Sequence, residues 1–160
     1  RTIEVVPFES HHQAAYHDLN MAWLSSFFPD QINAYDKAVL NDPEYHILQA
    51  GGRIWCALGV HGETEKVLGV VSVLPEDDGA SISMLKLAVV EHCQGQGIAQ
   101  RLIDRVVEYG KSLGVACISL ETNSSLLAAN ALYEKNGFVE KQRITPSHYE
   151  RADRYMEKIL

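Results

Sequence analysis

The stretch Gln94–Ala99, which reads Gln-Gly-Gln-Gly-Ile-Ala, constrains the fold of this chain more than any other. The run before it, residues 81–90, is rich in branched apolar residues and has the length of a strand. Apolar residues at helical spacing follow up to Leu113, and Gly114 then provides a stop. Two glycines at such a junction let the backbone approach a ligand, and free N–H groups at the new helix end favour an anion such as a pyrophosphate. The stretch therefore predicts an anion-binding turn, although a turn that only connects two elements has the same pattern.

The remainder of the chain alternates between strand and helix patterns. Extended segments are predicted at 2–8, 45–49, 53–60, 66–74, 81–90, 115–121, 138–144 and 154–160, and helices at 10–28, 31–40, 98–113 and 124–135. Ser10 is the expected N-cap of the first helix, and Asn136-Gly137 is the expected left-handed end of the last. The alternation predicts an α/β fold in which residues 1–160 form a single domain.

Charge is unevenly distributed along the chain. The net charge is −7. Residues 1–80 hold twelve acidic against four basic side chains, whereas residues 81–160 hold nine against ten. The half that would hold an anion is therefore the less repulsive one. The acidic balance argues against nucleic acid as a partner, because phosphate contacts need a basic patch. It leaves open whether the acidic faces are merely solvated or steer a cationic substrate.

The cysteine and histidine patterns bear on the cellular compartment of the protein and on whether it has a metal site. Cys56, Cys93 and Cys117 are odd in number and lack CxxC spacing, so a reduced, cytoplasmic setting is expected rather than a disulfide or zinc framework. Apolar runs fall short of the ~18–20 residues that cross a bilayer, and the start lacks the apolar core of a signal peptide, so no membrane association is expected. His11, His12 and His17 are interpreted as surface histidines, and no metal is expected; Cys93, beside the glycine turn, is interpreted as a small turn residue.

The residues from Leu87 to Ala99 resemble the acetyl-CoA-binding motif of the GCN5-related N-acetyltransferase (GNAT) family. That motif is Gln or Arg, two residues, Gly, one residue, then Gly or Ala, and it falls on Gln94, Gly97 and Ala99. Residues 120–123 and 130–138 resemble the next motif of the same family. The resemblance extends over residues 65–140. It implies a single-domain GNAT-like mixed sheet of about six to seven strands, with a splayed parallel pair at its centre and about four flanking helices.

The resemblance also implies acetyl-CoA as a cosubstrate. The strands 81–90 and 115–121 would run parallel and splay apart, leaving a slot in which strand amides pair with the pantetheine arm. The expected cofactor-binding residues are Leu87, Val89, Gln94, Gly95, Gln96, Gly97, Ile98, Ala99, Asn123 and Asn130. Asn130 lies three residues before Tyr133 on the last helix, so both side chains are expected to face this slot.

Tyr133 is the predicted general acid. Attack of an amine on a thioester expels a thiolate, which leaves more readily when it is protonated. A tyrosine hydroxyl with a pKa near 10 is still protonated at neutral pH and can donate that proton. The resembled family uses a tyrosine at this motif position.

The general base is less defined. Many members of the resembled family carry a Glu on the central strand, but residues 81–90 contain no carboxylate. Glu121 and His148 are the candidates, with a water-mediated base or an amine already deprotonated in solution as alternatives. Arg151 and Asp153 are candidates for contact with an acceptor carboxylate. On the acceptor side, Trp23, Phe27, Phe28 and Tyr35 either line the site or pack in the core.

The sequence therefore predicts an acetyl-CoA-dependent N-acetyltransferase that acts by direct attack of a primary amine in a ternary complex. No nucleophilic Cys or Ser triad is evident, which favours the direct route. A non-catalytic acyl-CoA-binding or sensing module is the alternative. A dinucleotide-binding oxidoreductase is excluded because Gln100 stands where its third glycine is required. The acceptor is left open among small amines, amino acids, polyamines and peptide or protein amines, and a homodimer is possible.

Overall fold

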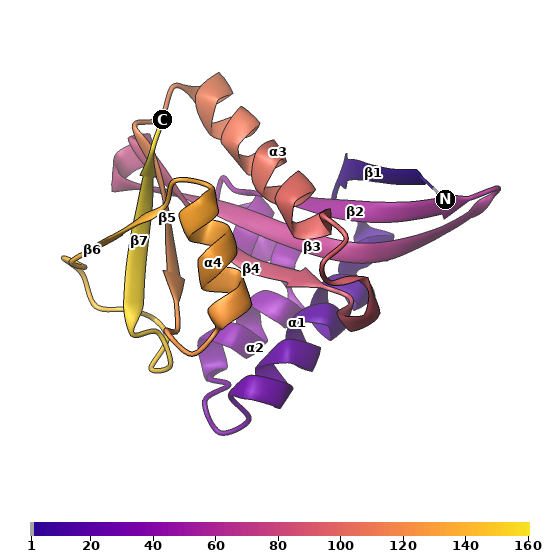
Figure 1. Cartoon of the computed structure of the whole chain (residues 1–160), viewed down its shortest axis with the longest axis horizontal. Coiled ribbons are helices and arrows are strands. Elements are labelled where there is room, and N and C mark those ends of the chain that lie inside the picture. The colour runs from indigo at the N-terminus through magenta and orange to yellow at the C-terminus, as the bar shows by residue number, and fades with distance from the viewer. Residues whose placement is uncertain (1) are drawn as a thin grey trace.

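A seven-stranded mixed sheet forms the centre of the molecule in the computed structural model, which describes residues 2–160 (Figure 1). The strands are β1 (Thr2–Pro7), β2 (Arg53–His61), β3 (Thr64–Glu76), β4 (Ser81–Val89), β5 (Cys117–Thr122), β6 (Val139–Lys141) and β7 (Arg154–Ile159). Their order is β1-β2-β3-β4-β5-β7-β6, and the β4–β5 pair is parallel whereas the other neighbours are antiparallel. The expected mixed sheet with a central parallel pair is confirmed.

The parallel pair separates part of the way along its length. β4 and β5 are paired from Ser81 with Cys117 to Met84 with Leu120. β4 then continues to Val89 without β5 beside it. Beyond Met84, the backbone groups on this edge of β4 therefore face a gap instead of a partner strand, as the expected splay requires.

A bulge in β4 lies at the point where the strands part. Ser72 of β3 pairs with Leu85, while Val70 pairs with Ala88, so two residues of β4 stand opposite one of β3. Lys86 is one of the two and has a φ of +58°, a left-handed conformation that is rare for a residue with a side chain. Bulges and such strained residues redirect side chains at functional sites, so this point of β4 marks the cleft described below.

Four α-helices cover the two faces of the sheet (Figure 1). They are α1 (Gln13–Phe27), α2 (Ala34–Asn41), α3 (Ile98–Leu113) and α4 (Leu127–Lys135), and the short helical turns are η1 (Ser10–His12), η2 (Glu44–Leu48), η3 (Asp77–Gly79) and η4 (Glu91–Cys93). The helices α1 and α2 pack on one face, and α3 and α4 on the other. Across residues 2–160, none of the helices has the length and apolarity needed to cross a membrane.

Side chains that point alternately to the two faces of the sheet form a hydrophobic core on each face. On β2, Trp55 and Ala57 point to the core beneath α3, whereas Ile54 and Cys56 point to the core beneath α1. Successive strand residues point to opposite faces, so a strand covered on both sides needs apolar residues at consecutive positions. The continuous apolar runs in β2 and β3 follow from this two-sided burial.

The start of the first helical segment differs from the prediction. Ser10 is not an N-cap but the first residue of the turn η1, and Glu9 and His12 form the cap instead: the Glu9 backbone N–H donates to Nδ1 of His12 at 3.0 Å. His12 is only 2 % exposed, so its interpretation as a surface histidine is wrong. Its Nε2 must carry the proton of the neutral ring, because Nδ1 accepts a hydrogen bond. Glu9, His11 and His12 bring ligand-type atoms within 4.8 Å of one another, but neither ring nitrogen of His12 is then available to a metal.

Other boundaries also shift. The extended segment expected at 45–49 is wrong: Glu44–Leu48 forms a helical turn, in which Asp42 accepts the Tyr45 backbone N–H at 3.1 Å and Ile47 is buried. α2 begins three residues late because Asn33 caps it. α4 begins three residues late because 123–125 form a side-chain-bonded turn. The strand expected at 138–144 is reduced to Val139–Lys141.

Candidate active site

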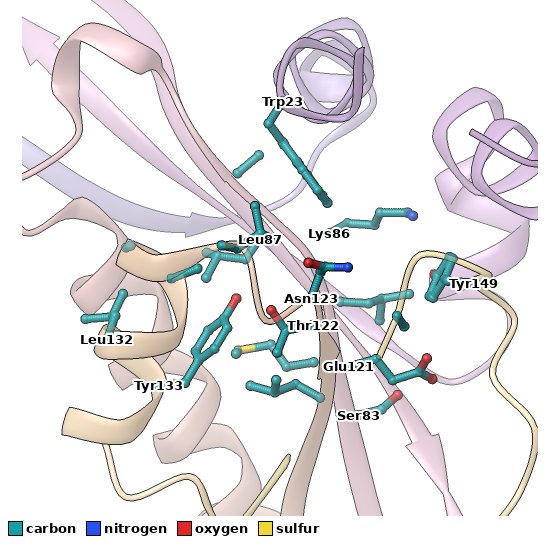
Figure 2. Close-up of a pocket in the computed structure, with 18 of the residues that line it drawn as sticks. Trp23, Ser83, Lys86, Leu87, Glu121, Thr122, Asn123, Leu132, Tyr133 and Tyr149 are labelled. Atoms are coloured by element: carbon teal, nitrogen blue, oxygen red, sulfur yellow. The ribbon is translucent and has the colours of Figure 1, made fainter. Parts of the chain in front are cut away.

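A cleft of about 1280 Å³ opens where β4 and β5 separate (Figure 2). Its walls come from β4, β5, the glycine turn before α3, and α4 on one side of the sheet. On the other side they come from the end of α1, Tyr35 of α2 and the segment 143–152. A single cleft therefore has walls on both sides of the sheet, at the opening between β4 and β5.

The glycine turn forms one end of the cleft as expected. Gly95 and Gly97 have φ values of +83° and +82°, and Gly97 is the N-cap of α3. A side chain at Gly97 would meet no described atom within 4 Å, so the position needs glycine for its conformation and not for lack of space. The first turn of α3 contains no acidic residue that would compete for an anion. Backbone N–H groups at a helix start that opens into a cleft can bind phosphate groups.

Most of the predicted cofactor-binding residues line the cleft. The lining residues among them are Leu87, Val89, Gln94, Gly95, Gly97, Ile98, Ala99 and Asn123. Gln96 does not line it, and its side-chain amide lies 3.5 Å from the His92 carbonyl. The Val89 carbonyl accepts the Gln94 side-chain amide at 3.4 Å, which ties the end of β4 to the turn.

Asn130 does not lie where its spacing from Tyr133 indicates. It is 6 % exposed and does not line the cleft with Tyr133. Its amide donates to the carbonyls of Asn123 and Leu126, both at 2.8 Å, and its oxygen accepts from Arg154 at 3.2 Å. Asn130 therefore fixes the turn that leads into α4, and the expectation that it faces the slot is wrong.

Tyr133 projects from α4 into the cleft, with its hydroxyl end toward the strand that carries Leu87 (Figure 2). Its ring packs edge-on against Phe138, with centroids 6.0 Å apart. Burial raises the pKa of Tyr133 to about 12, because the anionic form would lose solvation. The hydroxyl therefore keeps its proton at any physiological pH, as a proton donor must.

Glu121 and His148, the two candidate bases, both line the cleft. The Glu121 carboxylate pairs with Arg143 at 2.6 Å and accepts a hydrogen bond from the Ser147 hydroxyl. His148 is exposed, and its ring stacks on Tyr35 with centroids 4.3 Å apart. Two polar partners thus fix the Glu121 carboxylate, whereas His148 is positioned by ring stacking on Tyr35.

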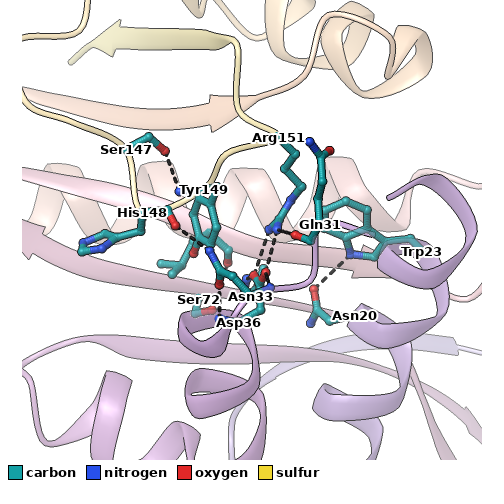
Figure 3. A network of polar contacts seen from close by, with 12 residues as sticks. Asn20, Trp23, Gln31, Asn33, Asp36, Ser72, Ser147, His148, Tyr149 and Arg151 are labelled. Carbon is teal, nitrogen blue, oxygen red and sulfur yellow. Dashed lines mark hydrogen bonds and ion pairs between the residues drawn. The ribbon is translucent and has the colours of Figure 1, made fainter. Parts of the chain in front are cut away.

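A buried ionic cluster, Asp36–Lys86–Arg151, lies at the end of the cleft away from the glycine turn. Figure 3 shows its Asp36–Arg151 pair. Arg151 donates to both oxygens of Asp36, with Nη1 at 2.6 Å from Oδ2 and Nη2 at 2.9 Å from Oδ1. The Lys86 ammonium lies 2.5 Å from Oδ1. The side chains of Asp36, Lys86 and Arg151 are 0, 2 and 7 % exposed. Sequence reasoning singled out Arg151 but missed Asp36 and gave Lys86 no role.

Opposing effects set the pKa values in this cluster. Burial alone would raise the pKa of Asp36, but the Arg151 hydrogen bonds and the Lys86 charge outweigh it and hold that pKa below its usual value. Burial lowers the pKa of Lys86 to about 8, although the Asp36 carboxylate acts in the opposite direction. Arg151, as a second cation, lowers it further. Lys86 is thus a buried ammonium that shares its ion-pair partner, Asp36, with Arg151.

Aromatic residues line the end of the cleft away from the glycine turn. Trp23, Phe27, Phe28 and Tyr35, for which lining the site and packing in the core were both left open, all border the cleft. Tyr149, which the sequence did not single out, packs among them. Asp153 does not line the cleft and instead accepts the backbone N–H and hydroxyl of Ser124.

Comparison with known proteins identifies a family and relatives for this chain. The family model described as the acetyltransferase (GNAT) family matches residues 13–138. The N-acetylaspartate synthetase of Danio rerio is 30% identical over 94 residues, which is 59% of this chain and 32% of that protein. This chain thus spans only about a third to two-fifths of the length of the curated relatives it matches first.

Two solved structures illustrate the shared fold. An acetyltransferase of the GNAT family from Staphylococcus aureus Mu50 superposes with a TM-score of 0.84 at 21% identity, with 99% of both chains covered. The spermidine N-acetyltransferase from Vibrio cholerae, in complex with CoA and spermine, superposes with a TM-score of 0.72 at 19% identity and covers 98% of this chain and 95% of its own. The splayed strands, the glycine turn and the match over most of the sequence agree: this chain belongs to the acetyltransferase (GNAT) family.

Proposed function

We propose that this protein transfers the acetyl group of acetyl-CoA to a primary amine by direct attack in a ternary complex. The observation that carries the proposal is the continuity of the cleft. Its lining extends from the glycine turn, past Tyr133 and through the opening between β4 and β5, to the end formed by Trp23, Phe27, Phe28 and Tyr35, which we call the acceptor end. The cosubstrate and the acceptor can therefore occupy it together, as a direct transfer requires.

The cofactor end offers backbone groups in two places. The N–H groups of the turn at Gly95 and Gly97 and of the first turn of α3 would bind the pyrophosphate. The unpaired edge of β4 beyond Met84 would pair with the amides of the pantetheine arm, as an added strand would. Related folds have been solved with CoA and with acetyl-CoA bound, which supports CoA binding by this chain.

In the proposed reaction, the amine nitrogen attacks the thioester carbon, a C–N bond forms and the C–S bond breaks. The sulfur leaves with the bonding electron pair and takes the proton of the Tyr133 hydroxyl. The nitrogen loses one proton. We assign Glu121 as its acceptor rather than His148, because Arg143 and Ser147 hold the Glu121 carboxylate in a fixed position in the cleft.

Thiol release from acetyl-CoA over a panel of amines, in the wild type and in Tyr133→Phe, tests the proposal. The variant keeps the ring contact with Phe138 and loses only the proton donor, so we expect kcat to fall by about 10²-fold or more while acetyl-CoA binding stays. Tyr45→Phe, an exposed tyrosine outside the cleft, is the matched control and should retain full activity.

Three other outcomes would count against parts of the proposal. Binding of acetyl-CoA without thiol release for every amine would favour a non-catalytic acyl-CoA-binding module. Equal rates for Tyr133→Phe and the wild type would remove Tyr133 as the acid. For the base, Glu121→Gln should lower kcat/KM by about 10-fold or more. If His148→Gln lowers kcat/KM more than Glu121→Gln does, His148 is the base instead of Glu121.

A further inference from the structure

We propose that the acceptor carries a carboxylate, as a free amino acid does, and that Lys86, Arg151 and Tyr149 bind this carboxylate. The proposal rests on the proposed acetyltransferase function and names the substrate class of the same cleft. Three independent features carry it: an uncompensated positive charge, the side on which that charge lies, and a hydroxyl without a partner.

The first feature is the charge balance of the cluster. Two cations, Lys86 and Arg151, share the single carboxylate of Asp36 within the described part of the chain. Glu121 is the further acidic group that acts on Lys86, but Arg143 pairs with it directly at 2.6 Å. One positive charge therefore remains in a region that is largely closed to water. A buried charge is costly unless a counter-charge accompanies it, and a bound anion would supply that counter-charge.

The second feature is the direction from which the cluster is approached. Lys86 and Arg151 line the cleft, whereas Asp36 lies behind them and does not. A ligand in the cleft would therefore approach the cluster from the side of Lys86, Arg151 and Tyr149 rather than from that of Asp36. The acidic lining residues Glu76 and Asp77 lie next to Ser81 at the start of β4, five or more positions from Lys86.

The third feature is Tyr149. Its ring is in contact with both cations: the Lys86 ammonium is 4.6 Å and the Arg151 guanidinium 4.4 Å from the ring centroid. Its hydroxyl is buried and has no hydrogen-bond partner among residues 2–160. An unpaired buried hydroxyl costs free energy, and a carboxylate oxygen at the cluster is the acceptor that it lacks.

The position of the cluster fits an acceptor whose amine and carboxylate are close together. Lys86 directly precedes Leu87, the residue of β4 toward which the Tyr133 hydroxyl points (Figure 2). A carboxylate held by Lys86 and Arg151 would leave the amine of the same small molecule at the opening between the strands. A polyamine, by contrast, would bring further positive charge against two cations, so it is expected to be a poor acceptor.

The test compares each of a panel of amino acids with its carboxamide, and includes spermidine as a polycation. For the best acceptor, we expect kcat/KM to be about 10- to 100-fold higher for the acid than for the amide, with the difference mainly in KM. Equal values for acid and amide, or a preference for spermidine, would overturn the carboxylate assignment and leave the acetyltransferase function intact.

Calorimetric binding of the acid and of its amide to the CoA-bound protein separates the two proposals. Tighter binding of the acid without turnover of any amine would support the carboxylate site and contradict the acetyltransferase function. Equal binding of both compounds would contradict the carboxylate site whether or not turnover occurs.

Lys86→Gln removes the surplus charge and leaves the Arg151–Asp36 pair intact, so the fold should be retained. We expect the ratio of kcat/KM for acid to amide to fall about 10-fold, through KM, whereas the exposed Lys66→Gln should keep the wild-type ratio. Tyr149→Phe, which removes the unpaired hydroxyl without changing any charge, should also lower the ratio of kcat/KM for acid to amide. An equal loss for acid and amide in both variants would indicate a purely structural role and overturn the proposal.

Discussion

The two ends of the cleft are built in different ways. The cofactor end is made mainly of backbone: a turn with two left-handed glycines, the N-terminus of α3 and the unpaired edge of β4. The acceptor end is made of side chains that come from three separate parts of the sequence, with Asp36, Lys86 and Arg151 at its centre. A backbone site can bind a cosubstrate common to a whole family, whereas a side-chain site can change with the acceptor.

The largest expected effect is a loss of stability on substitution at the acceptor end. Asp36→Asn leaves Lys86 and Arg151 buried beside each other without a carboxylate, and removing one partner of a buried ion pair typically costs about 3–5 kcal/mol. The free energy of unfolding, measured by urea denaturation at pH 7, should fall by this amount. A loss below about 1 kcal/mol would show that water or a rearranged side chain solvates the two cations.

The contrast between the ends also explains what could be predicted from the sequence. The glycine turn, the strand before it and the helix after it depend on local spacing, and all three were predicted. The residues of the turn that line the cleft were also predicted, except that Gln96 does not line it. The cluster at the other end joins residues that are 50 and 115 positions apart. No periodicity connects such positions, so only Arg151 was singled out.

The errors elsewhere arise from specific contacts that a residue pattern does not show. The ring of His12 accepts the Glu9 backbone N–H, and the side chain is buried rather than exposed. The extended segment expected at 45–49 is a helical turn because Ile47 packs into the core beneath α1. Asn130 turns away from the cleft because it satisfies two carbonyls of the turn before α4. The contacts of His12 and Asn130 are short-range and that of Ile47 is with the core, and each outweighs the general preference of its residue type.

The second expected effect concerns pH and again acts at the acceptor end. The pKa of Lys86 is lowered by burial from 10.5 to about 8 in the folded protein. Below pH 8 this lysine is charged in both states, and the folded state bears the cost of burying the charge. Between about pH 8 and pH 10.5 the folded state loses the proton first, so stability should rise with pH, by at most about 3 kcal/mol.

Urea denaturation of the wild type and of Lys86→Gln at pH 7, 8.5 and 10 isolates this effect. Other groups titrate in both proteins, so the difference between the two free energies of unfolding reports Lys86 alone. The free energy of unfolding of the wild type should rise relative to that of the variant as the pH rises. A difference that is constant over this range would mean that the lysine titrates alike in the folded and unfolded chain.

The smallest expected effect is at the cofactor end, where Gly97→Ala tests the backbone site. A methyl group at Gly97 meets no described atom within 4 Å, so the change strains only the left-handed backbone, at a cost of about 1 kcal/mol in stability. Because relief of that strain would turn the N–H groups at the start of α3, the KM for acetyl-CoA should rise about 10-fold. The kinetics of the amine should change little, since its site is formed by side chains.

Gly62→Ala provides the matched control for this last prediction. Gly62 also has a positive φ, of +63°, and also faces open space, but it lies in the β2–β3 hairpin turn and does not line the cleft. Both variants should therefore lose similar stability, and only Gly97→Ala should lose affinity for acetyl-CoA. If the two variants raise the KM equally, the backbone of the turn does not bind the cosubstrate. If Gly97→Ala also raises the KM for the amine, the two ends of the cleft are coupled through the strand between them.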